Sequence, residues 1–400
     1  MKSIKTGITF LLTMLNIYFL NAQTPIVGSL PGEAGVAPNG AATYSIPIWV
    51  TPGTNSVQPN LSLVYNSSTG NGILGPGWSI QGLTSISRTG KDWMHFPGQR
   101  TGMDVSVNDR YLLDGNLLFA TNNGTYHQGG TEYTTEVQTF SKITSVGNAG
   151  AGPDHFIVNT KDGFELEYGN TIDSKVELPN AITALMWQLN KTTDPNGNYM
   201  TYTYNENNGE STIQKIDYTF NSLHNITSYA SIEFEYVNRV FPQQYFISNV
   251  MIAQTQILSK IKVKYLNTEI RRYEFLYDNN AYPQRLKEIK YFGSNNEELK
   301  STEIEWGATT QNFTTQGIGV PNNQYQTNYF TWFKGDFNGD GIDDLISILQ
   351  NTTDHDANTG NDVNRDYLRL HLFDLNGYMN NVSGRGCDFD NLEERWVRVA

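Results

Sequence analysis

Short segments in which apolar and polar residues alternate run through most of this chain, and this alternation constrains the fold more than any other feature. Tyr44, Ile46 and Ile48 share one face of a predicted strand, and Leu61 and Leu63 share one face of the next. A period of two residues is typical of a half-buried β-strand, because successive side chains of a strand point to opposite faces. Helical patterns of comparable length are missing, so the sequence predicts an all-β protein.

Turn signals separate these predicted strands. Hairpins are expected around Asp114-Gly-Asn116, Asp162-Gly163 and Asn196-Gly197, because Asp-Gly and Asn-Gly supply the positive φ angles that tight turns need. Further strands are predicted at residues 231–236, 261–265, 272–277 and 302–306. Several alternate charged with apolar residues, which indicates one buried and one solvated face. We therefore expect a large curved antiparallel sheet of stacked hairpins. Pro47 lies within its strand and predicts an edge or a bulge there.

The first 22 residues have the pattern of a secretory signal peptide. Lys2 and Lys5 precede an apolar run, and Leu20-Asn-Ala22 forms a cleavage site before Gln23. The run is short for a membrane span, although an uncleaved anchor is the alternative. We expect a protein secreted to the extracellular space or the cell surface, with no membrane span after signal cleavage.

Charge and cysteine content exclude further classes. The formal net charge of −13 argues against binding to nucleic acid or to an anionic membrane. Cys387 is the only cysteine, so no internal disulfide can form, although export would permit one. Stability must therefore come from the core and the sheets.

A calcium-binding loop is predicted near the end of the chain. Asp336, Asn338, Asp340 and Asp344 stand at positions 1, 3, 5 and 9 of the loop DFNGDGIDD, and Ile342 supplies a backbone carbonyl at position 7. Oxygen ligands at alternate positions fold around a hard cation such as Ca²⁺, and the clustered carboxylates repel one another without one. We expect a structural Ca²⁺ ion; the alternative is a hairpin turn that binds nothing.

The flanks of this loop indicate which kind of calcium site it forms. An EF-hand needs a glutamate at position 12, where this chain has Ser347, and it needs helices on both sides. Residues 329–333 and 345–349 instead read as strands. The pattern DxNGDGxxD between strands resembles the FG-GAP or VCBS blade of integrin-type β-propellers. A propeller closes with about four to eight blades, so we expect the first, incomplete blade of a β-propeller and a chain that is a fragment of a longer protein.

A second resemblance lies near the start of the chain. The runs AATYSIPIWVTPG and PNLSLVYNSSTGNGILGPGWSIQGLTSISR, within residues 28–90, resemble the opening of the SpvB family. This amino-terminal region is shared by Salmonella virulence plasmid protein SpvB and the B subunits of insecticidal toxin complexes. The segment DPNGNYMTYTY is similar to an RHS/YD-type strand pair. Expected domains are therefore a signal peptide (1–22), an SpvB-like β-rich domain (23–306), a linker (307–328) and a partial propeller segment (329–400).

The resemblance implies a passive role. In SpvB the ADP-ribosylating activity belongs to a carboxyl-terminal domain that nothing here matches, and in the toxin complexes the homologous region helps to build a β-shell around a toxic cargo. It therefore implies a non-catalytic, virulence-related structural module whose partner is an RHS or toxin-complex subunit or a cargo domain, in cis or in trans. Two alternatives stay open, a calcium-dependent adhesion or carbohydrate-binding protein and a hydrolase with an unrecognised carboxylate pair.

A search for catalytic residues in the sequence favours the non-catalytic reading. None of the six histidines lies in a metal-protease or nucleophile motif, and the sequence has no GxSxG, HExxH or phosphate loop. Glu165 with Glu167, and Glu233 with Glu235, have the spacing of solvated charges on one strand face, although each pair has the residue types of a glycosidase site. We therefore expect no enzymatic activity.

Overall fold

The computed structural model describes residues 30–121 and 124–307, together with the backbone of four later strands. Contacts divide the chain into two units, residues Met1–Gly307 and Ala308–Ala400. The predicted signal peptide and residues 308–328 of the predicted linker lie outside the described residues. In the described part every regular element except two 3₁₀ turns is a strand, and no helix there has the length and apolar character to cross a membrane. The predicted all-β class is confirmed.

The first unit begins with a small antiparallel sheet in the order β1-β2-β3-β6. Its strands are β1 (Glu33–Val36), β2 (Ala42–Pro47), β3 (Ser62–Asn66) and β6 (Trp78–Gln81), and the short pair β4 (Asn71–Gly72) and β5 (Gly75–Pro76) lies in the loop before β6. The edge predicted for Pro47 is wrong, because β2 lies between β1 and β3. Pro47 is tolerated because the pairing with β1 stops at Ser45, so its missing N–H removes no bond of that ladder.

Eight strands then form a closed ring, since β13 pairs with β15, β15 pairs with β7, and each of the others pairs with its neighbours. They are β7 (Ser85–Thr89), β8 (Arg110–Leu113), β9 (Asn116–Ala120), β10 (Glu132–Thr135), β11 (Lys142–Val146), β12 (His155–Asn159), β13 (Glu165–Tyr168) and β15 (Ala184–Thr193). The predicted Asp-Gly hairpin is confirmed: Leu113 pairs with Asn116, and Asp114 and Gly115 have φ angles of 48° and 85°.

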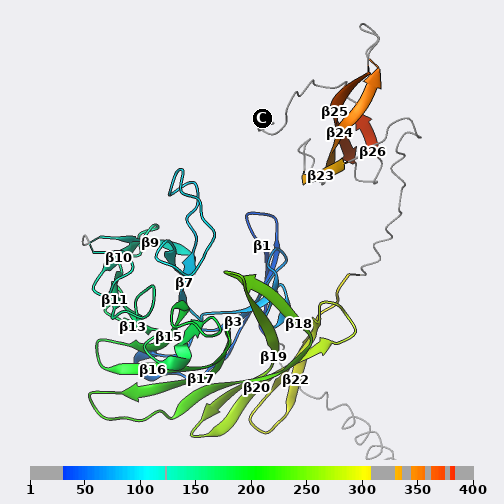
Figure 1. The fold of residues 1–400 in the computed structure, drawn as a ribbon. Helices are drawn as coiled ribbons and strands as arrows, with labels where there is room; N and C mark the ends of the chain where they lie inside the picture. Colours follow the sequence, from blue (N-terminus) through cyan, green and yellow to red (C-terminus); the bar gives the residue numbers. More distant parts are fainter. Residues whose placement is uncertain are drawn as a thin grey trace, which may run out of the picture. The chain divides into compact units, whose positions relative to one another are not determined.

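Strand β15 also starts the large sheet, because its residues Lys191–Thr193 pair with β16 as well as with β13. The sheet continues through β16 (Asn198–Asn207), β17 (Glu210–Asn221), β18 (Ala230–Ile247), β19 (Val250–Tyr265), β20 (Thr268–Asp278), β21 (Arg285–Phe292) and β22 (Glu298–Glu303), with β14 (Lys175–Glu177) beside β15. Figure 1 shows these strands as a curved layer. This is the curved antiparallel sheet of hairpins that the alternation predicts.

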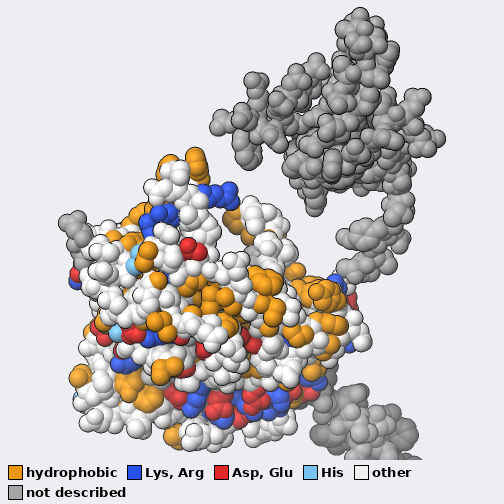
Figure 2. Space-filling model, viewed as in Figure 1, with side chains coloured by type: hydrophobic (Ala, Val, Ile, Leu, Met, Phe, Trp, Pro, Cys, Tyr) orange, Lys and Arg blue, Asp and Glu red, His pale blue; other side chains and the backbone are white. Residues whose placement is uncertain are grey.

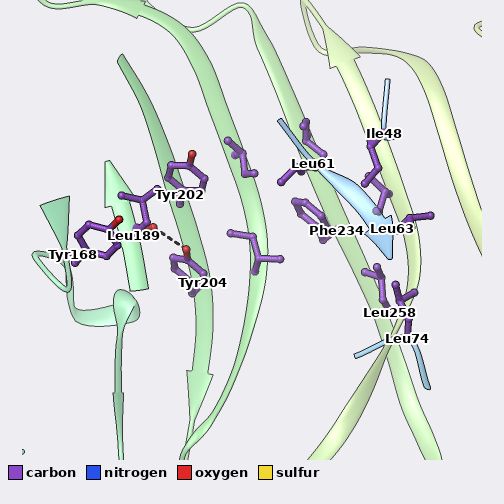
Figure 3. Close-up of a cluster of buried hydrophobic side chains, with 14 of the residues drawn as sticks. Ile48, Leu61, Leu63, Leu74, Tyr168, Leu189, Tyr202, Tyr204, Phe234 and Leu258 are labelled. Atoms are coloured by element: carbon purple, nitrogen blue, oxygen red, sulfur yellow. Dashed lines mark hydrogen bonds between the residues drawn. The ribbon is translucent and has the colours of Figure 1, made fainter. Parts of the chain in front are cut away.

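One apolar core joins the small sheet to the concealed face of the large sheet. Leu63 of β3 and Leu61, which directly precedes β3, pack in one cluster with Phe234 of β18 and Leu258 of β19, as Figure 3 shows. Trp78 is buried against the ring of Tyr65 at 5.4 Å. Each fully buried side chain of this size contributes about 1.5–3 kcal/mol to folding. The small sheet therefore covers one face of the large sheet.

A buried arginine holds the glycine-rich loop around β4 and β5. Arg239 is 5% exposed and lies in a bulge of β18, between the pairs Asn238↔Gln256 and Gln243↔Gln254. Its Nη2 donates to the Gly72 carbonyl at 2.5 Å and its Nη1 donates to Asn71 Oδ1 at 3.3 Å. Since a bulge re-aims a side chain, this irregularity turns the guanidinium toward the loop.

The interior of the closed ring is filled by aromatic side chains. Trp187 packs edge-on against Tyr111 at 5.3 Å and against Phe156 at 5.0 Å. The buried Arg88 lies over the rings of Tyr111 and Trp187 and donates to the Ala184 carbonyl at 2.7 Å. The ring therefore encloses a packed aromatic core.

The second unit contains one four-stranded antiparallel sheet, in the order β23-β24-β25-β26. Its strands are β23 (Tyr329–Gly335), β24 (Asp344–His355), β25 (Asp362–Phe373) and β26 (Met379–Val382). Four strands is the size of a propeller blade. That this sheet belongs to a propeller stays a prediction.

Candidate functional site

The face of the large sheet opposite the small sheet carries charges that continue in register from strand to strand. Lys215 on β17 faces Glu233 on β18, which faces Lys262 on β19, which faces Arg272 on β20. The first two of these pairs join opposite charges, and each such pair contributes about 0.2–1 kcal/mol. Lys262 and Arg272 are both cations, and each binds a neighbouring glutamate instead. We call this surface the polar face. Figure 2 shows blue and red side chains gathered along the lower border of the large sheet.

Ion pairs occupy the carboxylates of the polar face. Glu233 binds Lys264 at 2.6 Å, and Glu235 binds Lys262 at 2.5 Å. The hydrogen bond that Lys262 donates to Glu235 raises the pKa of Lys262, which keeps this ammonium charged. A retaining or inverting glycosidase needs one carboxyl group that is protonated and able to donate. Glu233 and Glu235 instead each accept from a lysine, so their arrangement supports the reading as paired surface charges.

The second carboxylate pair, Glu165 and Glu167, also lacks the arrangement of a catalytic pair. Glu167 accepts from Lys191 Nζ at 3.1 Å and from Asn170 Nδ2 at 2.6 Å. Burial pushes the pKa of Glu167 upward, but these two bonds outweigh burial and hold the pKa below its ordinary value. Glu165 is exposed, and among the described side chains it accepts from Asn159 Nδ2 at 3.4 Å. A catalytic acid needs a raised pKa, which Glu167 does not have.

The described histidines lie apart from one another. His95 bridges Asp92 at 2.7 Å and Glu136 at 2.9 Å, and these carboxylates, Glu136 first, accept from the imidazole and raise the pKa of His95. His127 meets the Tyr111 hydroxyl at 2.9 Å, and burial lowers its pKa to about 4. Within residues 30–121 and 124–307, no group of three or more His, Cys, Asp or Glu side chains is placed to hold a metal ion.

The predicted calcium ligands Asp336, Asn338, Asp340 and Ile342 lie outside the described residues, and so does Cys387. Asp344 is described in its backbone as the first residue of β24, where it pairs with Gly335, the last residue of β23. The prediction that this loop joins two strands is confirmed. The paired ends return the chain on itself, which is what ligands at alternate loop positions require, and carboxylate, amide and carbonyl oxygens suit a hard cation. Ca²⁺ binding itself stays a prediction.

A hollow of about 390 Å³ opens where the closed ring and the large sheet separate. Strand β15 pairs with β16 only at residues 191–193, and the 3₁₀ turn η3 (Ile172–Ser174) bridges the gap beyond. Asp173 Oδ2 accepts from the Tyr204 backbone N–H at 2.8 Å in place of a neighbouring strand. We call this feature the seam hollow. Its lining comes from separate stretches of β13, η3, β15 and β16, so no local sequence signal indicates it.

The seam hollow belongs to the polar face. Glu167 pairs in register with Lys191, Lys191 with Thr201, and Thr201 with Asp217. The first three of these residues line the hollow. Below them lie Tyr202 and Tyr204, whose rings belong to the buried core that Figure 3 shows.

Comparison with known proteins identifies relatives for the first unit. Residues 36–269 match the family model described as Salmonella virulence plasmid 65kDa B protein. The N-terminal domain of effector protein SpvB from Salmonella typhimurium strain LT2 is 17% identical, with a TM-score of 0.50, and the match covers 62% of this chain and 99% of that domain. No curated protein sequence matches the chain significantly.

Structures of toxin complexes also share the fold. A TcdB2-TccC3 crystal structure matches with a TM-score of 0.60 at 15% identity, over 87% of this chain and 19% of the other. A Tc holotoxin pore structure from Photorhabdus luminescens matches with a TM-score of 0.58 at 14% identity, over 91% of this chain and 20% of the other. The chain thus spans about a fifth of the toxin-complex chains that it resembles.

Proposed function

Since the match of residues 36–269 covers more than half of its length, this chain belongs to the SpvB family, and we propose that it is a non-catalytic structural module of a secreted, toxin-type protein. In this proposal the module forms part of a β-shell around a toxic cargo. Its likeness to toxin-complex chains and to the SpvB N-terminal domain supports a toxin-related structural role.

One observation carries the proposal: the closed ring and the large sheet form a single hydrogen-bonded sheet, and neither face of the large sheet is left both apolar and uncovered. The small sheet covers one face through the apolar core, and ion pairs such as Glu233–Lys264 occupy the other. A sheet with an exposed apolar face invites aggregation. A sheet that is covered on one side and charged on the other suits a wall with solvent, or an enclosed polypeptide, against it.

The second unit supplies the proposed calcium site. Asp336, Asn338, Asp340, the Ile342 carbonyl and Asp344 would hold the ion. Bound Ca²⁺ would neutralise the carboxylates of this loop and fix its turn. The pairing of Gly335 with Asp344 supports this reading, because it brings the two ends of the loop together. The role is structural, as in the blades that the loop resembles.

The kind of partner that we propose is suggested by the greater length of the toxin-complex chains. Because the chain spans about a fifth of the toxin-complex chains, the proposed shell needs further hairpins, supplied by a longer form of this chain or by an RHS-type subunit. The cargo would be a domain of the same polypeptide or of that subunit.

Of the two alternative functions, one has support from a specific feature of the structure. A calcium-dependent adhesion or carbohydrate-binding protein is favoured by the seam hollow, whose lining residues all carry hydrogen-bonding side chains. The hydrolase alternative has less support, because Glu167, Glu233 and Glu235 all accept from lysines.

Protection of a cargo from proteolysis tests the proposal. The DNA beyond codon 400 is read first, and the complete reading frame is then expressed with any RHS-type gene encoded next to it. We expect a cargo segment that trypsin cleaves when it is expressed alone and spares within the assembly. A cargo cleaved equally fast in both states would overturn the shell. Glycoside turnover that is lost in both Glu233→Gln and Glu235→Gln would show an enzyme instead.

A further inference from the structure

The seam hollow contains a buried amide with unused donors. Asn190 is 5% exposed, and its Oδ1 accepts from the backbone N–H of Asn170 at 3.0 Å. Its Nδ2 has no hydrogen-bond partner among the described residues, yet Asn190 lines the hollow. The side chain is fixed by this bond and by its burial, while Nδ2 reaches the solvent of the hollow. Two positioned N–H donors therefore lie where a ligand that accepts hydrogen bonds could replace water.

Acceptors and hydroxyls surround these donors. Asp173 uses Oδ2 for the Tyr204 N–H, and its Oδ1 has no partner within the described part of the chain. The Nδ2 of Asn170 binds Glu167, which leaves Asn170 Oδ1 as an acceptor. The hydroxyls of Thr201 and Thr203 can donate or accept, and no bond to either hydroxyl occurs among the described residues. The hollow therefore offers donors and acceptors together.

The charges of the hollow select against ions. Lys191 neutralises Glu167 at 3.1 Å, which leaves Asp173 as the unpaired charge. The negative charge of this carboxylate repels an anionic ligand. A single carboxylate also supplies too few oxygen ligands to hold a divalent cation. A neutral molecule that both donates and accepts hydrogen bonds fits better. The rings of Tyr202 and Tyr204 are buried beneath the lining and hold β16 in place, so the ligand would be bound by the polar groups.

We propose that the seam hollow binds a neutral saccharide, with one sugar unit donating hydroxyl protons to Asp173 Oδ1 and Asn170 Oδ1 and accepting from Asn190 Nδ2. A sugar offers adjacent hydroxyls that both donate and accept hydrogen bonds, which matches this mixture of donors and acceptors. The volume of about 390 Å³ lies in the range of about 300–1,000 Å³ that small-molecule sites occupy. The binding does not depend on the shell, and a shell whose outer surface carries it would recognise a glycan-coated surface.

The test uses an array that presents neutral, sialylated and sulfated oligosaccharides side by side, followed by titration calorimetry with lactose, cellotriose and maltotriose. Asp173→Asn keeps an acceptor for the Tyr204 N–H but replaces the free acceptor by a donor. Asp217→Asn is the matched control, because Asp217 lies on the same face, pairs with Lys215 at 2.9 Å and lies outside the hollow. Thermal denaturation verifies that both variants fold.

We expect the wild-type protein to bind neutral glycans, Asp173→Asn to weaken this binding at least tenfold, and Asp217→Asn to leave it within twofold. Thr203→Val, at an exposed strand position, gives a second loss of binding should Asp173→Asn fail to fold. Wild-type protein that binds no glycan, that binds only the sialylated or sulfated ones, or that binds equally after Asp173→Asn overturns the site. Any of these results leaves the shell proposal standing, because protease protection of the cargo tests that separately.

Discussion

Arg239 and Gly72 lie 167 residues apart in the sequence, and a hydrogen bond of 2.5 Å joins the guanidinium of the first to the carbonyl of the second. The same side chain donates to the Gln256 carbonyl at 3.0 Å. One buried cation thus ties the glycine-rich loop of the small sheet to two strands of the large sheet. The interlock between the two sheets depends on it as well as on apolar packing.

Arg239→Ala should therefore destabilise the first unit by about 2–4 kcal/mol, because it leaves buried carbonyl groups without donors and opens a cavity. Urea denaturation followed by tryptophan fluorescence measures the free energy of unfolding. Arg100→Ala is the control, since Arg100 is exposed and should change that free energy by less than about 0.5 kcal/mol. Equal effects of the two substitutions would show that the loop is held by packing alone.

Two glycines with the same backbone angle should respond differently to alanine. Gly169 has φ of 72°, and a Cβ there would lie 2.3 Å from Trp187 Cδ1, whereas Gly98 has φ of 75° and open space around it. Gly98→Ala should cost about 1–2 kcal/mol from the left-handed backbone alone. Gly169→Ala adds overpacking against a buried ring, for a total of about 3 kcal/mol or more. Thermal denaturation of both variants distinguishes the two contributions, and similar losses would contradict the packing around Trp187.

His127 should make the first unit sensitive to acid. Burial lowers its pKa to about 4, so the unfolded chain, with a histidine pKa of about 6.5, binds a proton more readily than the folded chain does. The stability from neutral His127 is complete above pH 6.5 and is lost as the pH falls toward 4. Allowing for its partial exposure, the loss is about 1–3 kcal/mol. His127→Gln should flatten this part of the curve of unfolding free energy against pH, and an unchanged slope would show that another group is responsible.

Asp340→Ala should weaken calcium binding by the second unit, because Asp340 is the central carboxylate of the predicted loop. Titration calorimetry with CaCl₂ on the whole chain gives the affinity, and Asp354→Ala, in β24 and outside the loop pattern, is the control. Wild-type protein that takes up no Ca²⁺ would favour the plain hairpin turn. Unchanged affinity in Asp340→Ala would place the ion elsewhere.

Local chemistry explains which parts of the fold the sequence predicts. The hairpin at Asp114-Gly115 depends on two residues with positive φ, and these are adjacent in the chain. The error at Pro47 has a nonlocal cause, because whether a proline disturbs a strand depends on how far the neighbouring strand reaches. Arg239 also escapes prediction, since its role comes from a bulge that only the pairing of β18 with β19 reveals.

The candidate site likewise has one part that the sequence predicts and one part that it does not. Alternating charges predict the polar face, because a strand with one apolar face must expose the other. The seam hollow combines Glu167, Asp173, Asn190 and Thr203, which no pattern along the chain connects. Only the divergence of β15 from β16 brings them together.

Strand β15 is a member of both the closed ring and the large sheet: its Trp187 pairs in register with Ile86 of the ring, and its Lys191 pairs in register with Thr201 of the large sheet. A linker between two bodies acts as a hinge, whereas a strand common to both has no point at which the backbone can pivot without breaking its ladder. A force applied at β22 would be transmitted through successive rows of hydrogen bonds to the aromatic side chains packed around Trp187 inside the closed ring. Loss of that packing should therefore destabilise the entire first unit, which would unfold in one cooperative step.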